Sequence, residues 1–521
     1  MNTNAPTNSP AGSSSPGDDL AIELHGINKS FGPVQANKDI NLKIKRGSIH
    51  GIIGENGAGK STLMSILYGF YQADSGWIKV KNELVTIPDS LTAIKLGIGI
   101  VHQHFMLVDN FTVLENIILG AEGGNILNSA MRTAKSELLR LEEEYGLKVD
   151  PDATIEELPV GLQQRVEILK ALFRGAEILI LDEPTGVLTP AEADHLFRIL
   201  EQLKAQGKTI LLITHKLREI MAITDEVSVM RRGEMVATRT TSETSPEELA
   251  ELMVGRRVLL QVDKGEAHPG DVKLDVQNIT VRDSRGVDMV KNVSLQVRAG
   301  EIVGIAGVAG NGQSELLQAI AGMMPIEQGS IILDGQPLDF DPAQLRQRGL
   351  AHVPEDRHHE GLVLPFEENE NSALGYHHDE TFVNGPFLDI DAMRADAVDK
   401  IEKYDIRPPN PRLKTANFSG GNQQKIVLAR EMERDPVVLL VGQPTRGVDV
   451  GAIEFIHRRI IEMRDAGKAV LLVSVELDEI RALSDRIMVM FDGRIVGERP
   501  PETSENQLGL LMAGIEDEQA A

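Results

Sequence analysis

A short glycine-rich run has the residue types of a phosphate-binding loop. Glycines let successive backbone N–H groups converge on phosphate oxygens without a Cβ in the way, and a helix that begins there adds a favourable dipole. Lys60 is placed to reach the β- and γ-phosphates of a nucleotide, and the Ser61 hydroxyl is placed to bind Mg²⁺. The run therefore predicts a nucleoside triphosphate site. Its residues are Gly54, Glu55, Asn56, Gly57, Ala58, Gly59, Lys60, Ser61 and Thr62.

Two neighbouring acids, Asp182 and Glu183, follow an apolar run further along the chain. An aspartate at this position can hold the Mg²⁺ shell, and the adjacent glutamate can polarise the water that attacks the γ-phosphate. Taken alone, paired acids after a strand are more often a helix cap or part of a solvated loop. Downstream of a phosphate loop, they predict hydrolysis of the nucleotide.

The elements that position these residues can be read from the hydrophobic pattern. Short apolar runs alternate with amphipathic segments, which predicts an α/β fold whose sheet is largely parallel. Residues 49–53 read as a buried strand, the glycine loop follows, and residues 61–68 open a helix. This order of strand, loop and helix is the context that a phosphate loop requires.

The sequence contains an internal repeat, in which the second half of the chain matches the first. The same interval separates Gly161 from Gly421 and Asp182 from Gly442, and each pair lies in matching segments. A period this long indicates duplicated domains rather than a solenoid. The sequence predicts a disordered tail (1–18), a first domain (19–256), a polar linker (257–271), a second domain (272–515) and a solvated tail (516–521).

The two copies have lost residues in opposite places. The second phosphate loop has Gln313 where the first has Lys60, and Gly442 and Gln443 stand where the first copy has two acids. A unit charge about 4 Å from a phosphate contributes roughly 4 kcal/mol at an effective dielectric near 20, so the second loop is weakened. A later segment differs in the opposite sense. The second copy has Ser419 followed by two glycines, whereas the first copy has Pro159 at the position of that serine. This reciprocity suggests one working site shared between two halves.

Composition excludes several classes of function. The 521 residues include 53 basic and 78 acidic side chains, and the net charge of −25 argues against nucleic acid held by phosphate contacts. There are no cysteines, so disulfides and thiolate chemistry are excluded. The apolar runs are far shorter than the ~20 residues of a membrane helix. The first residues lack the basic start and apolar core of a secretory signal.

Taken together, these motifs resemble the tandem ATP-binding subunit of an ABC importer. The resemblance covers nearly everything but the tails. It implies two tandem P-loop NTPase domains, each with a mixed, largely parallel sheet, an antiparallel β part and a helical subdomain. It also implies a composite ATP site with Mg²⁺, formed when the phosphate loop of one domain faces the signature segment of the other.

The resemblance assigns further residues to the competent site. In the first copy, Gln103 would bind the metal and act in catalysis, and His215 would contact the γ-phosphate and orient the glutamate and water. Phe31 would pack on adenine, although core packing is the alternative. The second copy would contribute Ser419, Gly420, Gly421 and Gln423, with Asp449 nearby.

The second composite site would then fail at each comparable position. Glu355 stands in place of Gln103, Val475 in place of His215, and Pro159 removes the signature hydroxyl. The resemblance therefore implies one catalytic site and one site that is structural or regulatory.

Several segments resemble the nucleoside, BMP-type branch of the simple-sugar importers more than the ribose or xylose branch. Residues 101–107, 161–170 and 183–190 carry this likeness. The implied partners are two membrane permease subunits and, indirectly, an extracytoplasmic solute-binding protein, with the chain at the cytoplasmic face of the membrane. The alternatives are import of a pentose or other sugar, a soluble tandem ATPase acting on ribosomes, and a regulator without activity.

Overall fold

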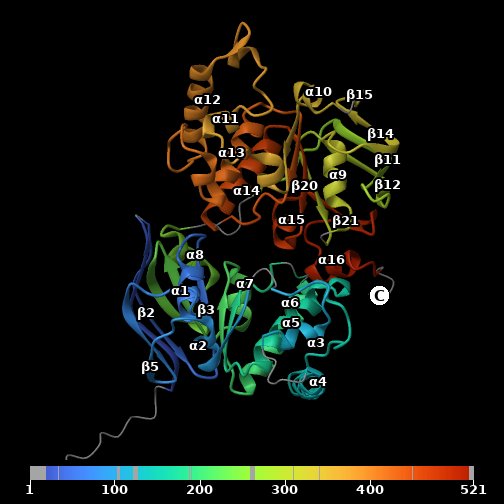
Figure 1. Cartoon of the computed structure of the whole chain (residues 1–521). Helices are drawn as coiled ribbons and strands as arrows, with labels where there is room; N and C mark the ends of the chain where they lie inside the picture. The colour runs from blue at the N-terminus through green and yellow to red at the C-terminus, as the bar shows by residue number, and fades with distance from the viewer. Residues whose placement is uncertain are drawn as a thin grey trace, which may run out of the picture. The chain divides into compact units, whose positions relative to one another are not determined.

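A computed structural model gives the fold of the chain. It describes residues 19–32, 34–102, 106–120, 127–186, 188, 190–257, 264–308, 310–338, 341–448 and 450–515. The chain divides into two compact units, Met1–Met253 and Val254–Ala521 (Figure 1). The division lies close to the predicted end of the first copy at residue 256.

The strands of the first unit form two sheets. They are β1 (Leu20–Phe31), β2 (Val34–Lys45), β3 (Ile49–Gly54), β4 (Ser75–Val80), β5 (Glu83–Val85), β6 (Ile98–Val101), β7 (Ile178–Asp182), β8 (Thr209–Ile213), β9 (Glu226–Arg231) and β10 (Glu234–Thr240). A six-stranded sheet has the order β10-β9-β3-β8-β7-β6, in which only the β9–β10 pair is antiparallel. An antiparallel sheet has the order β2-β1-β4-β5.

The glycine loop leaves the centre of the larger sheet. Every residue of β3 is buried, as expected of a strand covered on both faces. The loop connects β3 to α1, which begins at Lys60, one residue before the predicted start. The helices of this unit are α1 (Lys60–Leu67), α2 (Ser90–Lys95), α3 (Val113–Ile118), α4 (Leu127–Tyr145), α5 (Val160–Phe173), α6 (Pro190–Ala205), α7 (Leu217–Ile223) and α8 (Pro246–Val254).

One core of the first unit lies between its two sheets. Ile52 of β3 and Ile213 of β8 pack there with Leu63 of α1 and with apolar residues of β1, β2 and β4. Apart from this core, α3, α4 and α5 contact one another and form a helical subdomain. A capping box at Thr112 and Glu115 fixes the start of α3.

The second unit repeats this architecture. Its strands are β11 (Val272–Arg282), β12 (Asp288–Arg298), β13 (Glu301–Ala306), β14 (Ile326–Leu333), β15 (Gln336–Pro337), β16 (Leu350–Val353), β17 (Val383–Asn384), β18 (Phe387–Leu388), β19 (Val438–Gly442), β20 (Ala469–Ser474), β21 (Arg486–Phe491) and β22 (Arg494–Arg499). The six-stranded sheet has the order β16-β19-β20-β13-β21-β22, the antiparallel sheet has the order β12-β11-β14-β15, and β17 and β18 form a hairpin.

The helices of the second unit cover both faces of its larger sheet. They are α9 (Gln313–Ile320), α10 (Pro342–Gln347), α11 (Glu368–Ser372), α12 (Ile390–Lys403), α13 (Gly420–Met432), α14 (Val450–Asp465), α15 (Leu477–Leu483) and α16 (Glu505–Met512). Along β20, Leu471 packs in the core that holds α9, and Leu472 packs in the core that holds α13 and α14. In Figure 1, α9 accordingly lies on one side of β20 and α13 and α14 lie on the other.

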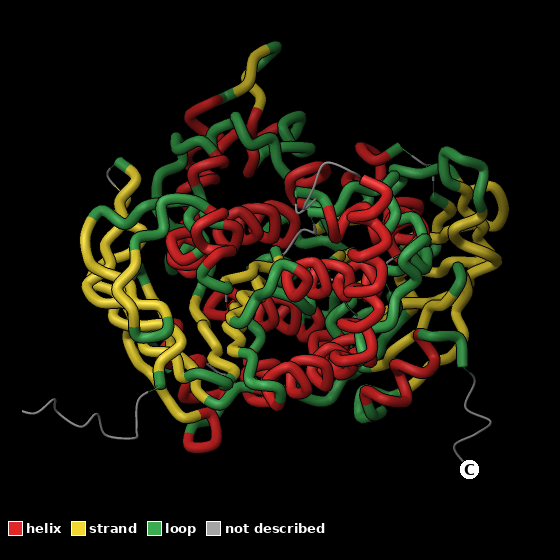
Figure 2. Tube along the Cα trace, turned by 60° about the horizontal axis from the view of Figure 1, so that its bottom comes forward, coloured by secondary structure: helices red, strands yellow, loops and turns green. Residues whose placement is uncertain are grey.

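The predicted fold class is confirmed. Each unit combines a mixed, largely parallel sheet with an antiparallel sheet and a helical part, and Figure 2 shows the yellow strands of each antiparallel sheet gathered as a layer. Within the described ranges, no helix has both the length and the apolar character needed to cross a membrane.

Candidate functional site

The first phosphate loop depends on glycine at two positions. Gly57 and Gly59 have φ angles of 80° and 99°, in the left-handed region that favours glycine. A Cβ on Gly59 would also lie 2.2 Å from the carbonyl oxygen of Ala36. The backbone at Gly59 therefore approaches β2 as closely as only glycine permits, and α1 begins directly after it.

Lys60 folds back over the loop. Its side chain is buried, and Nζ donates to the carbonyl oxygens of Gly54 at 2.6 Å and Glu55 at 3.0 Å. Burial lowers the pKa of Lys60, while the nearby charges of Glu183 and Asp182 oppose that effect. Lys60 is thus the cation that this loop can offer to a phosphate.

Asn37, which lies on β2 outside the phosphate loop, stabilises that loop by a hydrogen bond. Its side chain is buried in β2, and Nδ2 donates to the Gly59 carbonyl at 3.0 Å. The Gly233 N–H, in the turn between β9 and β10, donates to the Ala58 carbonyl at 3.1 Å. These contacts could not be predicted from the sequence, because nothing in the local pattern relates Asn37 or Gly233 to the loop.

Asp182 and Glu183 stand at the carboxyl end of β7. Burial, and after it the charge of Glu183, raise the pKa of Asp182 to about 6, while Lys60 opposes the shift. For Glu183, burial acts to raise the pKa, but the hydrogen bond and charge of His215, together with Lys60, outweigh it and the pKa is lowered. Glu183 therefore stays ionised at neutral pH, as a catalytic base requires.

The structure brings His215 and Glu183 together. His215 Nδ1 lies 2.9 Å from Glu183 Oε1. The N–H of Glu183 donates to the carbonyl of Ile213, the last residue of β8, at 2.8 Å. Adjacent parallel strands thus end at one edge of the sheet and present the glutamate and the histidine side by side.

Two further contacts brace the segment after the acids. The Thr185 hydroxyl donates to the buried carboxylate of Glu219, whose pKa is raised by burial. Gln164 of α5 donates through Nε2 to the Pro184 carbonyl at 2.6 Å. Neither contact was predicted, since each joins residues from separate elements. Both fix the backbone that carries Glu183, whose φ is 46°.

Phe31 lies at the end of β1 with 43% of its surface exposed. Its ring meets the ring of Tyr71 edge to face, with centroids 5.1 Å apart. The exposure speaks against the alternative that Phe31 packs in the core. The pair forms an aromatic surface, and Tyr71 was not predicted as part of it.

Two predicted residues, Gln103 and Asp449, lie outside the described residues. Of the predicted metal ligands, Ser61 lies in the first turn of α1 and Asp182 ends β7. A hydroxyl and a carboxylate are the oxygen ligands that Mg²⁺ prefers, so this donor set fits the metal. In the described part of the chain, no three His, Asp or Glu side chains gather into a metal site.

The intact signature segment lies at the start of α13 in the second unit. Ser419 is the N-cap, and its Oγ accepts from the Asn422 side chain at 2.8 Å. A Cβ on Gly420 would lie 3.0 Å from the Gly447 carbonyl oxygen. Gln423 is buried and donates to the Thr415 carbonyl at 3.0 Å. The hydroxyl and the glycine are therefore held at the N-terminal end of the helix.

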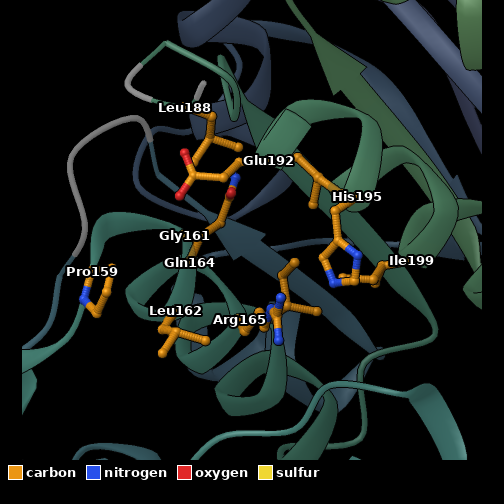
Figure 3. Close-up of a pocket in the computed structure, with 11 residues that line it drawn as sticks. Pro159, Gly161, Leu162, Gln164, Arg165, Leu188, Glu192, His195 and Ile199 are labelled. Atoms are coloured by element: carbon orange, nitrogen blue, oxygen red, sulfur yellow. The ribbon is translucent and has the colours of Figure 1, made fainter. Parts of the chain in front are cut away.

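The altered signature segment of the first unit begins α5. Its N-cap is Pro159, whose side chain makes no capping hydrogen bond, although its carbonyl accepts from the backbone N–H groups of Leu162 and Gln163. Beside it a cavity of about 370 Å³ lies between α5 and α6, and Figure 3 shows Glu192 and His195 of α6 facing Gly161 and Arg165 of α5. The cavity is lined by Pro159, Gly161, Leu162, Gln164, Arg165, Ile168, Leu188, Glu192, His195, Leu196 and Ile199.

The second unit has neutral groups where the first has its charged catalytic groups. Gln313 is buried and donates through Nε2 to the Val308 carbonyl at 3.1 Å, in the place of Lys60. Gln443 Oε1 accepts from the backbone N–H of Val475 at 3.3 Å, in the place of the Glu183 contact with His215. No base is available from this pair.

The sequence of this chain is similar to one family model and to several known import proteins. The family model described as ABC transporter matches residues 37–186 and 290–446. A nucleoside import ATP-binding protein of Lactococcus lactis subsp. cremoris is 50% identical over 499 residues, covering 95% of this chain and 99% of that protein. A guanosine import ATP-binding protein of Bacillus subtilis is 49% identical over 504 residues, covering 96% and 99%. A glucose import ATP-binding protein of Haloferax volcanii is 44% identical over 525 residues, covering 95% and 96%.

Proposed function

This chain belongs to the ABC transporter family and is the ATP-binding, ATP-hydrolysing subunit of an importer, and from that premise we propose that it energises nucleoside uptake with one competent ATP site. The observation that carries the single-site proposal is the contact between Glu183 and His215, 2.9 Å apart. Its counterpart in the second unit joins Gln443 to a backbone N–H.

The proposed reaction in the first unit is ATP hydrolysis, carried out by Lys60 of the phosphate loop and by the groups that follow β7 and β8. Lys60 would donate to the β- and γ-phosphates, and Glu183 would accept a hydrogen bond from the attacking water. As the water oxygen bonds to the γ-phosphorus, the bond to the β–γ bridging oxygen breaks and ADP leaves. His215 would hold Glu183 Oε1 in place and donate to the γ-phosphate. Ser61 and Asp182 would hold Mg²⁺, which, when bound, neutralises phosphate charge.

The other side of the competent site is proposed to come from the second copy. Ser419, Gly420, Gly421 and Gln423 would face the γ-phosphate of ATP held by the first loop. Supporting this, Ser419 retains its hydroxyl at the start of α13, whereas Pro159 offers none at the start of α5. Gln103 and Asp449 are proposed for this site on family resemblance alone.

Adenine is proposed to pack on the exposed pair of Phe31 and Tyr71. An aromatic face offers stacking to any purine at roughly 1–3 kcal/mol per base. Lys29 Nζ lies 5.5 Å from the Phe31 ring centroid and donates to Asp74 Oδ1 at 2.9 Å.

Nucleosides are the proposed solute because the relatives at 50% and 49% identity are named for nucleoside and guanosine import. Import of a sugar is the second candidate, favoured by the glucose import relative at 44% identity. Two membrane permease subunits and a solute-binding protein are the proposed partners. The chain would then act at the cytoplasmic face of the membrane, attached through the permeases.

The test is ATP hydrolysis by the chain reconstituted with its permeases in vesicles. Nucleoside-loaded binding protein should stimulate turnover, and pentose- or glucose-loaded preparations should not. The Glu183→Gln chain serves as the inactive control. Stimulation by sugars with none by nucleosides would overturn the proposed solute. Turnover that survives Glu183→Gln would overturn the proposed site.

A further inference from the structure

A short helical turn after β16 lies along the signature helix α13 in the second unit. The turn spans Arg357–Gly361. Near its start, His358 Nε2 lies 2.8 Å from Oε1 of Gln423 in α13. At its end, the Gly361 carbonyl accepts from Arg430 Nη1 of the same helix at 2.8 Å. The turn is therefore fixed to α13 near both of its ends.

The guanidinium of Arg357, the first residue of this turn, lies against the start of α13. A Cβ on Gly420 would lie 2.8 Å from Arg357 Nη2, so glycine at this position leaves room for the guanidinium. Arg357 Nη1 donates to the Arg446 carbonyl at 2.7 Å, which fixes the plane of the group. Gly420 directly follows Ser419, the N-cap of α13. A positive charge thus lies next to the residue that carries the signature hydroxyl.

No acid in the described part of the second unit pairs with this charge. Arg357 forms no ion pair there, and its Nε is buried without a hydrogen-bond partner. Burial lowers the pKa of Arg357, the charge of Asp356 acts to raise it, and the charge of Arg446 lowers it further. The Asp356 carboxylate instead accepts from the N–H groups of His358 and His359. The guanidinium is therefore close to an acid that is engaged elsewhere.

This placement of Arg357 is unfavourable for stability. The N-terminal end of a helix carries a partial positive charge, so a cation beside the start of α13 is repelled. A buried N–H group without a partner is unfavourable as well. An anion brought to this point would relieve the repulsion, and it would meet the guanidinium, the helix end and the Ser419 hydroxyl together. The arrangement is therefore suited to a phosphate rather than to packing.

The first copy lacks this charge. Arg357 matches Phe105 of the first copy, because each lies two positions after the matched pair Glu355 and Gln103. A phenylalanine side chain has no hydrogen-bond donor to offer to a phosphate. The copy that keeps the signature hydroxyl, on Ser419, is thus also the copy that carries a cation beside it.

We propose that Arg357 is a further catalytic residue of the competent ATP site, where its guanidinium donates to the γ-phosphate beside the Ser419 hydroxyl. This rests on the proposed function, in which the signature segment of the second copy meets ATP bound by the loop of Lys60. The guanidinium would balance the charge that spreads over the γ-phosphate oxygens as the bond to ADP breaks. Nη2, which makes no hydrogen bond in the described part of the chain, would be the donor, while the Arg446 carbonyl holds Nη1.

The test compares two changes at Arg357 in the full chain reconstituted with its permeases. Arg357→Gln removes the charge and should lower kcat by about 10²-fold or more, as loss of one donor to developing charge does. The KM for ATP should stay near the wild-type value, because an interaction made only in the transition state affects kcat. Arg357→Lys keeps the charge without the planar fork, so its kcat should lie between those of Arg357→Gln and wild type. Equal losses of kcat in the two variants, or wild-type turnover in Arg357→Gln, would overturn the proposal.

Thermal unfolding and a matched control separate catalysis from packing. Arg357→Gln removes a cation from the positive end of α13, so it should unfold at a temperature no lower than Arg357→Lys, although it is less active. Arg412→Gln removes an exposed arginine from the loop before the signature segment and should keep wild-type kcat. A loss of kcat in Arg412→Gln equal to that in Arg357→Gln would overturn the proposal.

Glu183→Gln, measured in the same preparation, distinguishes failure of this proposal from failure of the proposed function. If Glu183→Gln abolishes turnover and Arg357→Gln does not lower it, the role of Arg357 is wrong and the competent site stands. Turnover that survives Glu183→Gln would overturn the competent site itself, and the role of Arg357 with it. Loss of kcat in both variants, with ATP still bound by each, is the result that we expect.

Discussion

His215 Nδ1 lies 2.9 Å from Glu183 Oε1, at the shared edge of two parallel strands. This contact fixes the direction of the Glu183 carboxylate. It also lowers the pKa of Glu183, against the effect of burial. In the second unit, Oε1 of the matching Gln443 accepts from the backbone N–H of Val475, and no histidine stands in the place of His215, so neither effect arises there.

Glu183→Gln should abolish turnover while leaving ATP binding intact. The amide keeps the shape of the carboxylate but cannot accept the proton of the attacking water, and loss of a general base lowers kcat by about 10²–10⁴-fold. Phosphate release and labelled-ATP binding are measured on the same preparation. Gln443→Ala, the matched change in the second unit, should keep turnover near wild type. Equal losses from both variants would contradict the assignment.

His215→Ala should lower kcat by about 100-fold with little change in the affinity for ATP. The reason is that Glu183 loses the partner that orients it and lowers its pKa. The pH dependence of kcat separates this from general damage: its acidic limb should shift to higher pH, since the glutamate would then ionise at higher pH. A loss of kcat with an unshifted acidic limb would exclude the positioning role.

Ser419→Ala should slow hydrolysis, whereas Pro159→Ser should change it little. Ser419 is the N-cap of the intact signature helix, so its removal also lowers helix stability by about 1 kcal/mol. Thermal unfolding should therefore accompany the rate measurements, and variants are compared at a temperature where both are folded. Equal slowing by the two changes would refute the asymmetry between the sites.

The sequence could predict the parts of the site that are local. The loop from Gly54 to Thr62 and the acids after an apolar run carry their chemistry in consecutive residues, and the fold class follows from strands and helices that alternate. Asn37 could not be predicted, because its contact with Gly59 joins elements that only the fold brings together. For the same reason Glu355 reads as a loss in the sequence, although its side chain fills the space beside Gly442.

Gly59→Ala should destabilise the first unit more than Gly57→Ala. Both glycines have positive φ, which makes alanine unfavourable by about 1–2 kcal/mol. At Gly59 the new Cβ would also meet the Ala36 carbonyl oxygen at 2.2 Å, whereas nothing lies within 4 Å at Gly57. Urea unfolding followed by circular dichroism gives the two free energies. Equal losses would show that close approach to β2 adds nothing beyond the backbone angle.

Glu368, at the start of α11, should make the second unit less stable as the pH rises. Its side chain is fully buried, and burial raises its pKa to about 7, with the Ser372 hydrogen bond opposing the shift. Because the folded pKa lies above the unfolded value, the unfolded chain releases the proton first. The stability that the protonated form provides is therefore lost between about pH 4.5 and pH 7.

Glu368→Gln should remove this dependence, since the amide stays neutral and can still accept from Ser372, which donates to Glu368 Oε1 at 2.6 Å. We expect the melting temperature of the variant, relative to wild type, to increase from pH 5 to pH 8, with a difference in free energy of about 1–3 kcal/mol at the upper end. Asp391→Asn, which changes an exposed acid in α12, should show no such trend. A pH-independent difference for Glu368→Gln would mean that the buried carboxyl does not titrate in this range, and that another group is responsible for any loss of stability at high pH.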